Sequence, residues 1–379
     1  MTNDLTRKEF LQALAGAAAI AAVPTFTACS APKSKIKLGV CTYSYNGDLQ
    51  QGRMNLEDCV ADMADLGAEG IEFLGEALVP NFPNPDEQWF DWLKGVMEKY
   101  NIKPIAYTGF IDTRLYRNRA LSAQEIAQSM EPELKIMNKL GFKLFRGLGS
   151  SWEHALALPP DSVWAKAGVK MEDVYDEVMP LLDKYDVTIS EEIHSPERLG
   201  SDLLKRIVDY VDKTKTHRIG LCPDMGIFQD RMRRSTIENY YAQAGRQNIV
   251  DFILKNFEDN IPQERILEEV KKMGGNETEL RMAGPSGIYH GSYNNANRNK
   301  PEDLAKYVPY IKHVHGKFWE MTEDLKEYSI PYDKVIPVLI KGGFDGYICS
   351  EYEGNRNVFQ AQIQLRRQHY MIRQLLAKA

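Results

Sequence analysis

The chain has 379 residues, of which 43% are hydrophobic and 26% charged, and its formal net charge is −6. This composition is ordinary for a folded protein, so it excludes a chain that stays disordered for lack of apolar surface. The negative charge argues against a nucleic-acid partner, because phosphate binding requires a basic surface.

The first 28 residues have the order of a secretory signal. Arg7 and Lys8 precede an apolar run of small residues at 11–23, which is too short for a good membrane-spanning helix. Residues 6–11 (TRKEFL) resemble a twin-arginine export signal, and residues 26–29 (FTAC) resemble a lipoprotein cleavage box. We predict a signal peptide over 1–28 that is cleaved before Cys29, and hence an exported protein that is periplasmic or anchored to the membrane as a lipoprotein. A frayed amphipathic tail is the alternative.

A polar linker at 29–35 leads into short β-rich runs that alternate with amphipathic helical runs. Eight such units in a row predict an α/β fold, a (β/α)8 TIM barrel over 36–379, with a doubly wound open sheet as the alternative. The expected strands are 36–45, 70–75, 103–110, 142–149, 187–194, 219–228, 311–319 and 346–353. The expected helices include 55–66, 87–100, 123–140, 171–184 and 201–213.

One stretch interrupts this alternation. Between the sixth and seventh expected strands, residues 229–300 are too many for one crossover helix, and they include helical runs at 231–256 and 263–272. A segment rich in Gly and Asn follows at 274–299. We predict an insertion between strands 6 and 7, which is either a lid over the site or a surface excursion without a role in chemistry.

The cysteines do not form a metal or redox motif. Cys41, Cys222 and Cys349 lie in strand-like runs, Cys59 lies in a helical run, and no two cysteines have the CxxC spacing. We therefore expect these four to be small buried core residues without disulfides.

Each of four expected strands in the second half of the chain ends in side chains that can bind a metal ion. Carboxylates and imidazoles at the carboxyl ends of barrel strands lie over one open face, where a barrel enzyme can hold a divalent cation. The four motifs are residues 190–194 (SEEIH), 222–224 (CPD), 313–317 (HVHGK) and 349–353 (CSEYE).

Strand alternation selects among these side chains, because residues two apart share a face of a strand and adjacent residues do not. One inward-facing set then contains three carboxylates and one imidazole. Three crowded acids without a cation would repel one another, so the cluster indicates a bound metal. The donors suit Mn²⁺ first, with Mg²⁺, Co²⁺ or Zn²⁺ as alternatives. The predicted metal ligands are Glu192, Asp224, His315 and Glu351.

Four further side chains are expected near the mouth of the barrel, and we predict that they bind the substrate. His194 and Lys317 lie on the inward faces of the fifth and seventh expected strands. Arg146 and Glu72, on the fourth and second, either reach the mouth or pair with each other inside it. For Lys317 the alternative is a surface lysine. His313 lies deeper and is expected to be a hydrogen-bonded core residue.

These motifs resemble those of the xylose isomerase-like barrel superfamily of sugar isomerases and epimerases. The resemblance spans nearly the whole chain after residue 36, and it implies that the four ligands hold one divalent cation. It also implies that Glu192 and Glu351 are the catalytic, proton-moving residues. Ile227 and Phe318 stand where many members have a histidine and an aspartate, so the sugar contacts are expected to differ. The residues that carry the resemblance are 192–194 (EIH), 224–226 (DMG), 313–317 (HVHGK) and 346–354 (GYICSEYEG).

The resemblance implies a metal-dependent sugar isomerase or epimerase that moves a proton beside the carbonyl of a keto-sugar. The alternative is a lyase that eliminates the aglycone of a 3-keto-glycoside, which suits an exported protein with altered sugar contacts. A non-catalytic sugar-binding lipoprotein is a remote alternative, because a binder would not need all four ligands. An apurinic-site endonuclease would need more histidines and a basic groove.

We expect a small-molecule sugar or glycoside as the partner, and membrane contact only through a lipid anchor at Cys29. Homo-oligomer formation is left open by the sequence.

Overall fold

A computed structural model of the chain describes residues 34–109, 115–116, 118–147, 162–194, 197–243, 245–284, 299–354 and 359–378. The signal peptide, the lipid-anchor site and most of the linker lie outside these ranges, so they stay predictions. Within the described ranges, no helix is both long enough and apolar enough to cross a membrane.

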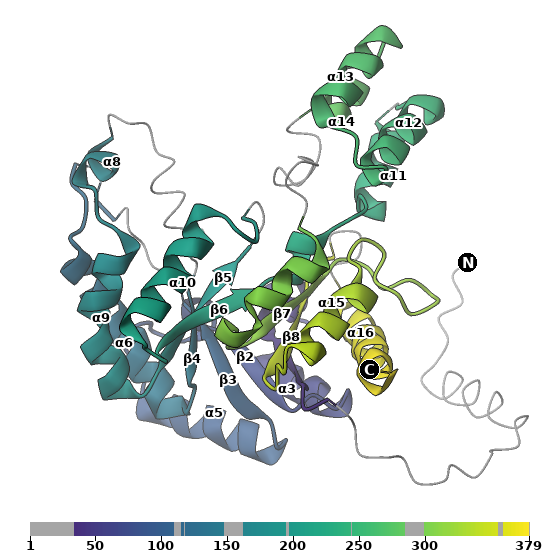
Figure 1. The fold of residues 1–379 in the computed structure, drawn as a ribbon. Helices are drawn as coiled ribbons and strands as arrows, with labels where there is room; N and C mark the ends of the chain where they lie inside the picture. Colours follow the sequence, from purple (N-terminus) through teal and green to yellow (C-terminus); the bar gives the residue numbers. More distant parts are fainter. Residues whose placement is uncertain are drawn as a thin grey trace, which may run out of the picture. The chain divides into compact units, whose positions relative to one another are not determined.

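Eight parallel strands form the centre of the fold (Figure 1). They are β1 (Lys37–Cys41), β2 (Gly70–Leu74), β3 (Lys103–Thr108), β4 (Leu144–Gly147), β5 (Thr188–Ile193), β6 (Ile219–Pro223), β7 (Val314–Phe318) and β8 (Tyr347–Tyr352). The hydrogen-bonded order is β6-β5-β4-β3-β2-β1-β8-β7. Two isolated parallel bridges, Leu221 with Ile311 and Asp224 with His315, join the remaining edges. The predicted (β/α)8 barrel is therefore confirmed, and its seam lies between β6 and β7.

Helices follow the strands around the outside of the barrel. The longer ones are α3 (Leu56–Asp65), α5 (Glu87–Lys99), α6 (Ala123–Leu140), α9 (Met171–Tyr185), α10 (Asp202–Thr214), α15 (Tyr332–Lys341) and α16 (Ala361–Lys378). Short helices are α2 (Asn46–Gln50), α4 (Gly75–Leu78) and α8 (Val163–Ala167). The five helices expected from the sequence begin and end within one residue of the observed bounds. Local signals explain this agreement: α6, for example, begins at a Ser122/Glu125 capping box and ends at Gly141, whose φ is 87°.

The first and sixth strands are shorter than the sequence predicts. After β1 and β6 the chain turns into the 3-10 helices η1 (Thr42–Tyr45) and η2 (Met225–Phe228). At η2 the turn has a clear cause, because the Asp224 carboxylate accepts a hydrogen bond from the Gly226 N–H at 2.6 Å. The residues within each 3-10 turn stay mostly buried, so an apolar run alone does not distinguish a strand from a strand followed by a tight turn.

The chain between β6 and β7 forms helices with an apolar core of their own. These are α11 (Arg234–Ala242), α12 (Gln247–Glu258), α13 (Gln263–Lys272) and α14 (Glu277–Ala283), and two 3-10 helices, η5 (Pro301–Lys306) and η6 (Val308–Tyr310), lead back to the barrel. Arg246 and Glu279 form an ion pair of 2.7 Å within this group. The core residues are Met232, Tyr240, Ile249, Val250, Ile253, Phe257, Ile266, Val270, Met282 and Ala283.

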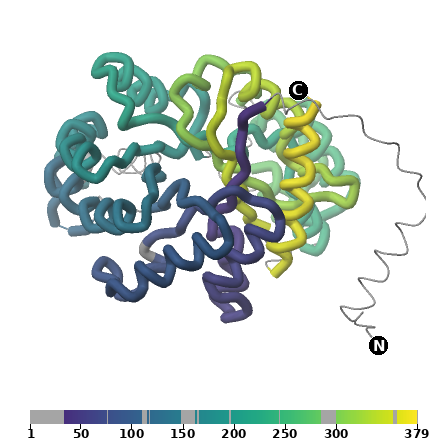
Figure 2. Tube along the Cα trace, turned by 90° about the horizontal axis from the view of Figure 1, so that it is seen from below, coloured from purple at the N-terminus to yellow at the C-terminus, as the bar shows by residue number. Residues whose placement is uncertain are grey.

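Helix α16 joins the end of the barrel domain to its beginning (Figure 2). Asp62 on α3 accepts hydrogen bonds from Arg366 at 2.6 Å and from Gln362 at 3.1 Å. Arg373 donates to the Leu66 carbonyl at 2.9 Å, which satisfies an acceptor at the end of α3. These contacts hold the first and last units of the barrel together.

Two adjacent acids on β5 lie on opposite faces of the strand. Glu192 points into the barrel, whereas Glu191 contacts α9, where the Tyr175 hydroxyl donates to its Oε1 at 2.8 Å. Glu191 is only 1% exposed. Burial raises its pKa to about 7, even though the bond from Tyr175 acts in the opposite direction. The folded state therefore disfavours the charged form of Glu191.

We expect Glu191→Gln to remove part of the pH dependence of folding stability. The pKa of Glu191 is raised from 4.5, its ordinary value, to about 7 in the folded state. The stability that Glu191 contributes to the folded state is therefore fully present below pH 4.5 and is lost as the pH rises through 7. Between pH 5 and 8 the wild type should lose about 2–3 kcal/mol more than the variant in urea unfolding. The exposed Glu98→Gln variant should follow the wild type. Equal pH profiles for Glu191→Gln and wild type would contradict this assignment.

Candidate metal centre

The four predicted ligands converge at the carboxyl end of the barrel. Glu192 on β5, Asp224 after β6, His315 on β7 and Glu351 on β8 each offer one ligand atom, and these atoms all lie within 4.8 Å of one another. Each residue is at most 3% exposed. The structure thus brings together the set that strand alternation selected.

Three buried atoms of this cluster make ion-pair contacts but no hydrogen bond among the described residues, namely Asp224 Oδ2, His315 Nδ1 and Glu351 Oε2. Buried polar atoms normally have partners, so three such atoms in one place need an explanation. His315 Nδ1 lies 2.8 Å from Glu192 Oε1 and 3.2 Å from Glu351 Oε2. Lone pairs from one imidazole and several carboxylates therefore face a common point, which fits a divalent cation with mixed oxygen and nitrogen ligands.

Arg146 from β4 is the first of two buried cations beside the cluster. Its guanidinium lies 3.1 Å from Glu192, 3.9 Å from Glu351 and 3.8 Å from Glu72. Burial alone would raise the pKa of Glu192, but Arg146 and His315 lower it to about 2. Glu192 is consequently ionised at neutral pH, as a metal ligand or a base must be.

Lys317 from β7 is the second buried cation. It is 2% exposed, so it is not a surface lysine. Its Nζ lies 2.8 Å from Glu351 Oε2, 2.8 Å from Glu353 Oε1 and 3.4 Å from Asp224 Oδ2. Burial acts to raise the pKa of Glu351, yet Lys317 and His315 hold that pKa well below its usual range. For Asp224 burial prevails over Lys317, and its pKa is raised.

Glu72 lies one layer below the ligands and is fully buried. Its Oε1 lies 2.7 Å from His315 Nε2 and accepts a hydrogen bond from the Thr108 hydroxyl at 3.0 Å. A carboxylate that takes the proton-bearing nitrogen of a histidine leaves the other nitrogen free to bind a metal. Glu72 therefore contacts His315 and Arg146, and within the described structure it forms no hydrogen bond with the other three predicted ligands. In this position it can orient the His315 ring for metal binding.

His194 lies at the rim of the site, where its side chain is 26% exposed and its Nε2 is 4.0 Å from Asp224 Oδ2. A pocket of about 10 Å³, the size of one water, opens here. Trp319 also lines this pocket and was not singled out from the sequence, although it lies two residues after Lys317, just beyond the end of β7. The lining residues are His194, Asp224, Gly226, Gln229, Lys317, Trp319 and Glu353.

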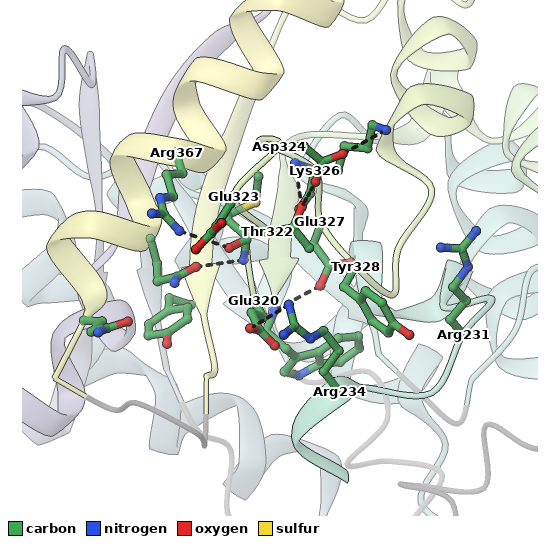
Figure 3. A pocket seen from close by; sticks show the side chains of 15 residues that line it. Arg231, Arg234, Glu320, Thr322, Glu323, Asp324, Lys326, Glu327, Tyr328 and Arg367 are labelled. Atoms are coloured by element: carbon green, nitrogen blue, oxygen red, sulfur yellow. Dashed lines mark hydrogen bonds and ion pairs between the residues drawn. The ribbon is translucent and has the colours of Figure 1, made fainter. Parts of the chain in front are cut away.

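A larger pocket of about 940 Å³ lies along the loop that follows β7 (Figure 3). Trp319 lines both pockets, whereas none of the four ligands lines the larger one. The Arg233 guanidinium lies 3.7 Å from the Trp319 ring centroid, and Arg234 is 3.4 Å from Glu320. The beginning of the 229–300 segment therefore contacts this pocket. The two alternatives for the segment, a lid and a surface excursion without a role in chemistry, both stay predictions.

The sequence matches the family described as xylose isomerase-like TIM barrel over residues 60–275, more than half of the chain. The protein therefore belongs to this family. In solved structures, the fold is similar to that of the IOLI protein with a bound zinc atom, with a TM-score of 0.53 and 14% identity over 90% of this chain and 99% of that one. A D-psicose 3-epimerase solved in the presence of D-fructose gives a TM-score of 0.50 and 11% identity, over 90% of this chain and all of that one. These two likenesses concern the fold alone.

Curated relatives align over most of the chain. The 3'-dehydrocarminate deglycosidase alpha subunit of a Microbacterium species is 25% identical over 333 residues, which are 84% of this chain and 88% of that protein. The C-glycoside deglycosidase alpha subunit of Microbacterium trichothecenolyticum is 25% identical over 325 residues, 83% of each chain.

We expect Asp224→Asn to weaken Mn²⁺ binding by more than ~100-fold, because the loss of a ligand should exceed the 10–100-fold effect typical of residues behind the ligands. Isothermal titration of the metal-free protein with Mn²⁺ measures this. Asp209→Asn, on the exposed face of α10, should bind like the wild type. An unchanged dissociation constant for Asp224→Asn would remove Asp224 from the ligand set.

We expect Lys317→Met to destabilise the metal-free protein by about 3–5 kcal/mol, because it leaves buried carboxylates without their cation. Saturation with Mn²⁺ should recover much of this loss, since the ion supplies positive charge at the same place. Urea unfolding with and without Mn²⁺ tests both statements. Lys326→Met, which breaks an exposed pair with Asp324, should leave stability nearly unchanged. If Mn²⁺ does not reduce the loss of stability in Lys317→Met, Lys317 does not compensate charge at the metal centre.

Proposed function

We propose that the protein is a divalent-metal-dependent enzyme that removes the aglycone of a 3-keto-glycoside by elimination. The observation that supports this proposal is a pair of buried, ionised carboxylates, Glu192 and Glu351, which lie 2.8 Å and 3.2 Å from His315 Nδ1. Such a pair supports removal of a proton beside a carbonyl. The choice of a glycoside over a free sugar is supported by the relatives named deglycosidases. The 3'-dehydro prefix of one of them denotes a ketone on the sugar ring.

In the proposed reaction one of the two carboxylates accepts the proton from the carbon between the ketone and the anomeric carbon. A carbon–carbon double bond forms as the bond from the anomeric carbon to the aglycone breaks. The leaving aglycone takes up one proton, and we assign the partly exposed His194 as the donor of that proton. The carboxylate that accepted the proton from carbon then transfers it to the His194 imidazole. A divalent cation held by Glu192, Asp224, His315 and Glu351 would polarise the carbonyl.

Two apolar residues at positions that are polar in many family members support a substrate other than the usual free sugars. Ile227 is 6% exposed and Phe318 is fully buried, and both pack in the apolar core. They make no polar sugar contact at the places where many members have a histidine and an aspartate. An export signal, which stays a prediction, would fit an unphosphorylated glycoside.

A metal-dependent sugar isomerase or epimerase is the second candidate. Glu192 and Glu351 both approach His315 Nδ1, so one could remove a proton and the other return it to the opposite face or to the adjacent carbon. The two candidates share the first step and differ in the fate of the intermediate. Incubation with a 3-keto-glycoside should release aglycone if elimination occurs, whereas incubation with free keto-sugars should yield isomers for the second candidate.

We expect Glu351→Gln to lower kcat by about 10²–10⁴-fold, because it removes an acid–base group while preserving its shape. Release of aglycone from a 3-keto-glycoside measures turnover, and circular dichroism checks the fold. Glu191→Gln is the matched control, because this acid lies on the outer face of β5; its kcat should equal that of the wild type. Retained activity in Glu351→Gln would overturn the assignment of Glu351.

A further inference from the structure

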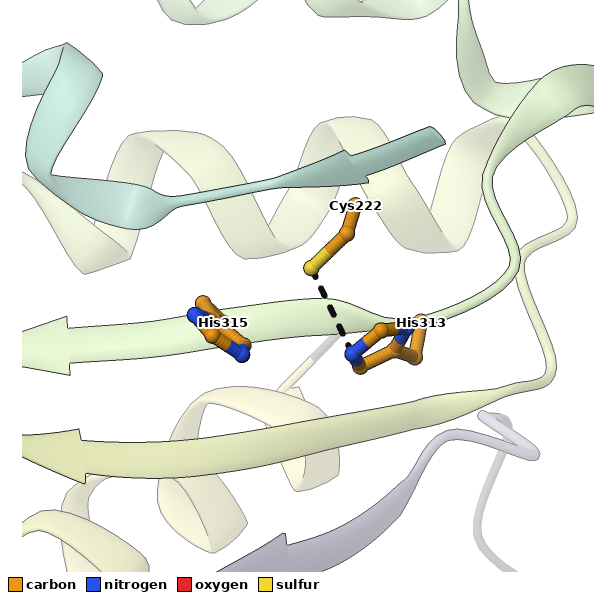
Figure 4. A group of neighbouring side chains, drawn as sticks. All are labelled: Cys222, His313 and His315. Atoms are coloured by element: carbon orange, nitrogen blue, oxygen red, sulfur yellow. Dashed lines mark hydrogen bonds between the residues drawn. The ribbon is translucent and has the colours of Figure 1, made fainter. Parts of the chain in front are cut away.

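A second group of side chains that could bind a metal shares His315 with the first group and adds Cys222 and His313 (Figure 4). These two residues precede Asp224 and His315 by two positions, so they lie deeper in the barrel. Cys222 on β6, His313 just before β7 and His315 each offer one ligand atom within 4.8 Å of the others. All three residues are fully buried. Cys222 is also a free thiol, as are the other three cysteines of the described chain, and all four are buried as expected.

Two distances from His313 Nε2, one to Cys222 and one to the neighbouring Glu72, match those between ligands of a zinc ion. Cys222 Sγ lies 3.4 Å from His313 Nε2, and Glu72 Oε2 lies 3.5 Å from the same nitrogen. Zinc bonds of ~2.3 Å to sulfur and ~2.0–2.2 Å to nitrogen or oxygen place two ligands of a tetrahedral site roughly 3.4–3.6 Å apart. The contact from His313 to Glu72 is longer than an ordinary hydrogen bond.

His313 is held in the orientation that a ligand needs. Its Nδ1 lies 2.9 Å from the Ser190 hydroxyl, so that Nε2 is directed toward Cys222 and Glu72. When Nδ1–H donates to the hydroxyl, Nε2 carries a lone pair.

Glu72 supplies an independent observation. Its Oε2 has no hydrogen-bond partner among the described residues although the side chain is fully buried, while Oε1 is occupied by His315 and Thr108. An unsatisfied carboxylate oxygen in the interior is costly, and a cation beside it would remove that cost.

We propose that Cys222, His313 and Glu72 bind a second divalent ion of the zinc type below the first metal centre. His315 links the two layers, because its Nε2 contacts Glu72 and its Nδ1 faces Glu192 and Glu351. Sulfur and nitrogen donors select Zn²⁺ or Co²⁺, whereas the oxygen-rich upper set also suits Mn²⁺ and Mg²⁺. Binding converts the thiol to a thiolate, and its proton passes to solvent.

The position of this second ion suggests what it does for the fold. Cys222 and His313 lie on opposite sides of the seam between β6 and β7, where only the isolated bridges Leu221–Ile311 and Asp224–His315 join the two strands in the described structure. An ion coordinated from both sides would cross-link this seam. Its role is therefore to close the barrel and to fix the floor of the catalytic layer.

Titration of the metal-free protein with Co²⁺ tests the proposal. Thiolate coordination produces an intense sulfur-to-cobalt charge-transfer band in the near ultraviolet, which oxygen and nitrogen ligands do not produce. We expect the wild type to bind two equivalents of Co²⁺ per chain and to show this band. Neither readout depends on turnover, so failure of the proposed enzymatic function would not affect the result.

Variants assign the two equivalents to the two layers. Cys222→Ala should lose the band and one equivalent, and Asp224→Asn should keep the band while it loses the other equivalent. Cys59→Ala, which removes a buried thiol on α3, should behave like the wild type. A single equivalent without the band in the wild type, or a band that persists in Cys222→Ala, would overturn the proposal. The wild-type titration decides the matter even if Cys222→Ala does not fold.

Discussion

Charge compensation inside the barrel is the constraint on which the rest of the structure depends. In the upper layer four carboxylates, Glu192, Asp224, Glu351 and Glu353, face two permanent cations, Arg146 and Lys317. The acids outnumber the cations, and a divalent ion would offset part of the excess negative charge. Electrostatic interactions are strong in a poorly solvated interior, so these groups tolerate burial only as a set.

The same residues take part in closing the barrel. Asp224 and His315 form one of the two bridges across the seam, and the long excursion between β6 and β7 begins and ends close to them. Asn299, at the end of that excursion, donates to the Ile227 carbonyl at 2.9 Å and accepts from the Leu199 N–H at 2.8 Å. A metal at this place would therefore stabilise the seam of the fold as well as serve the chemistry of the site.

The interior has two layers with different donor chemistry. The upper layer is rich in oxygen and contains the two carboxylates that we assign to proton transfer, and the lower layer combines Cys222, His313 and Glu72. His315 contacts both layers, one with each ring nitrogen. The protonation state and orientation of this ring therefore couple the floor of the barrel to the catalytic centre.

The sequence by itself determined the barrel class, the five helices indicated by apolar periodicity and caps, and the four side chains that converge at the predicted metal centre. These signals are local. The spacing of apolar residues and the capping residues predict a helix and its ends. Because side chains alternate along a strand, the sequence alone places Glu191 and Glu192 on opposite faces. The turns after Cys41 and Asp224 were missed, because buried residues continue beyond each strand. Only the tertiary structure showed that Lys317 is buried and that His313 contacts both Cys222 and Glu72. The physical reason is that these contacts depend on the relative register of strands that are far apart in the chain, and register is set by packing and closure of the whole barrel.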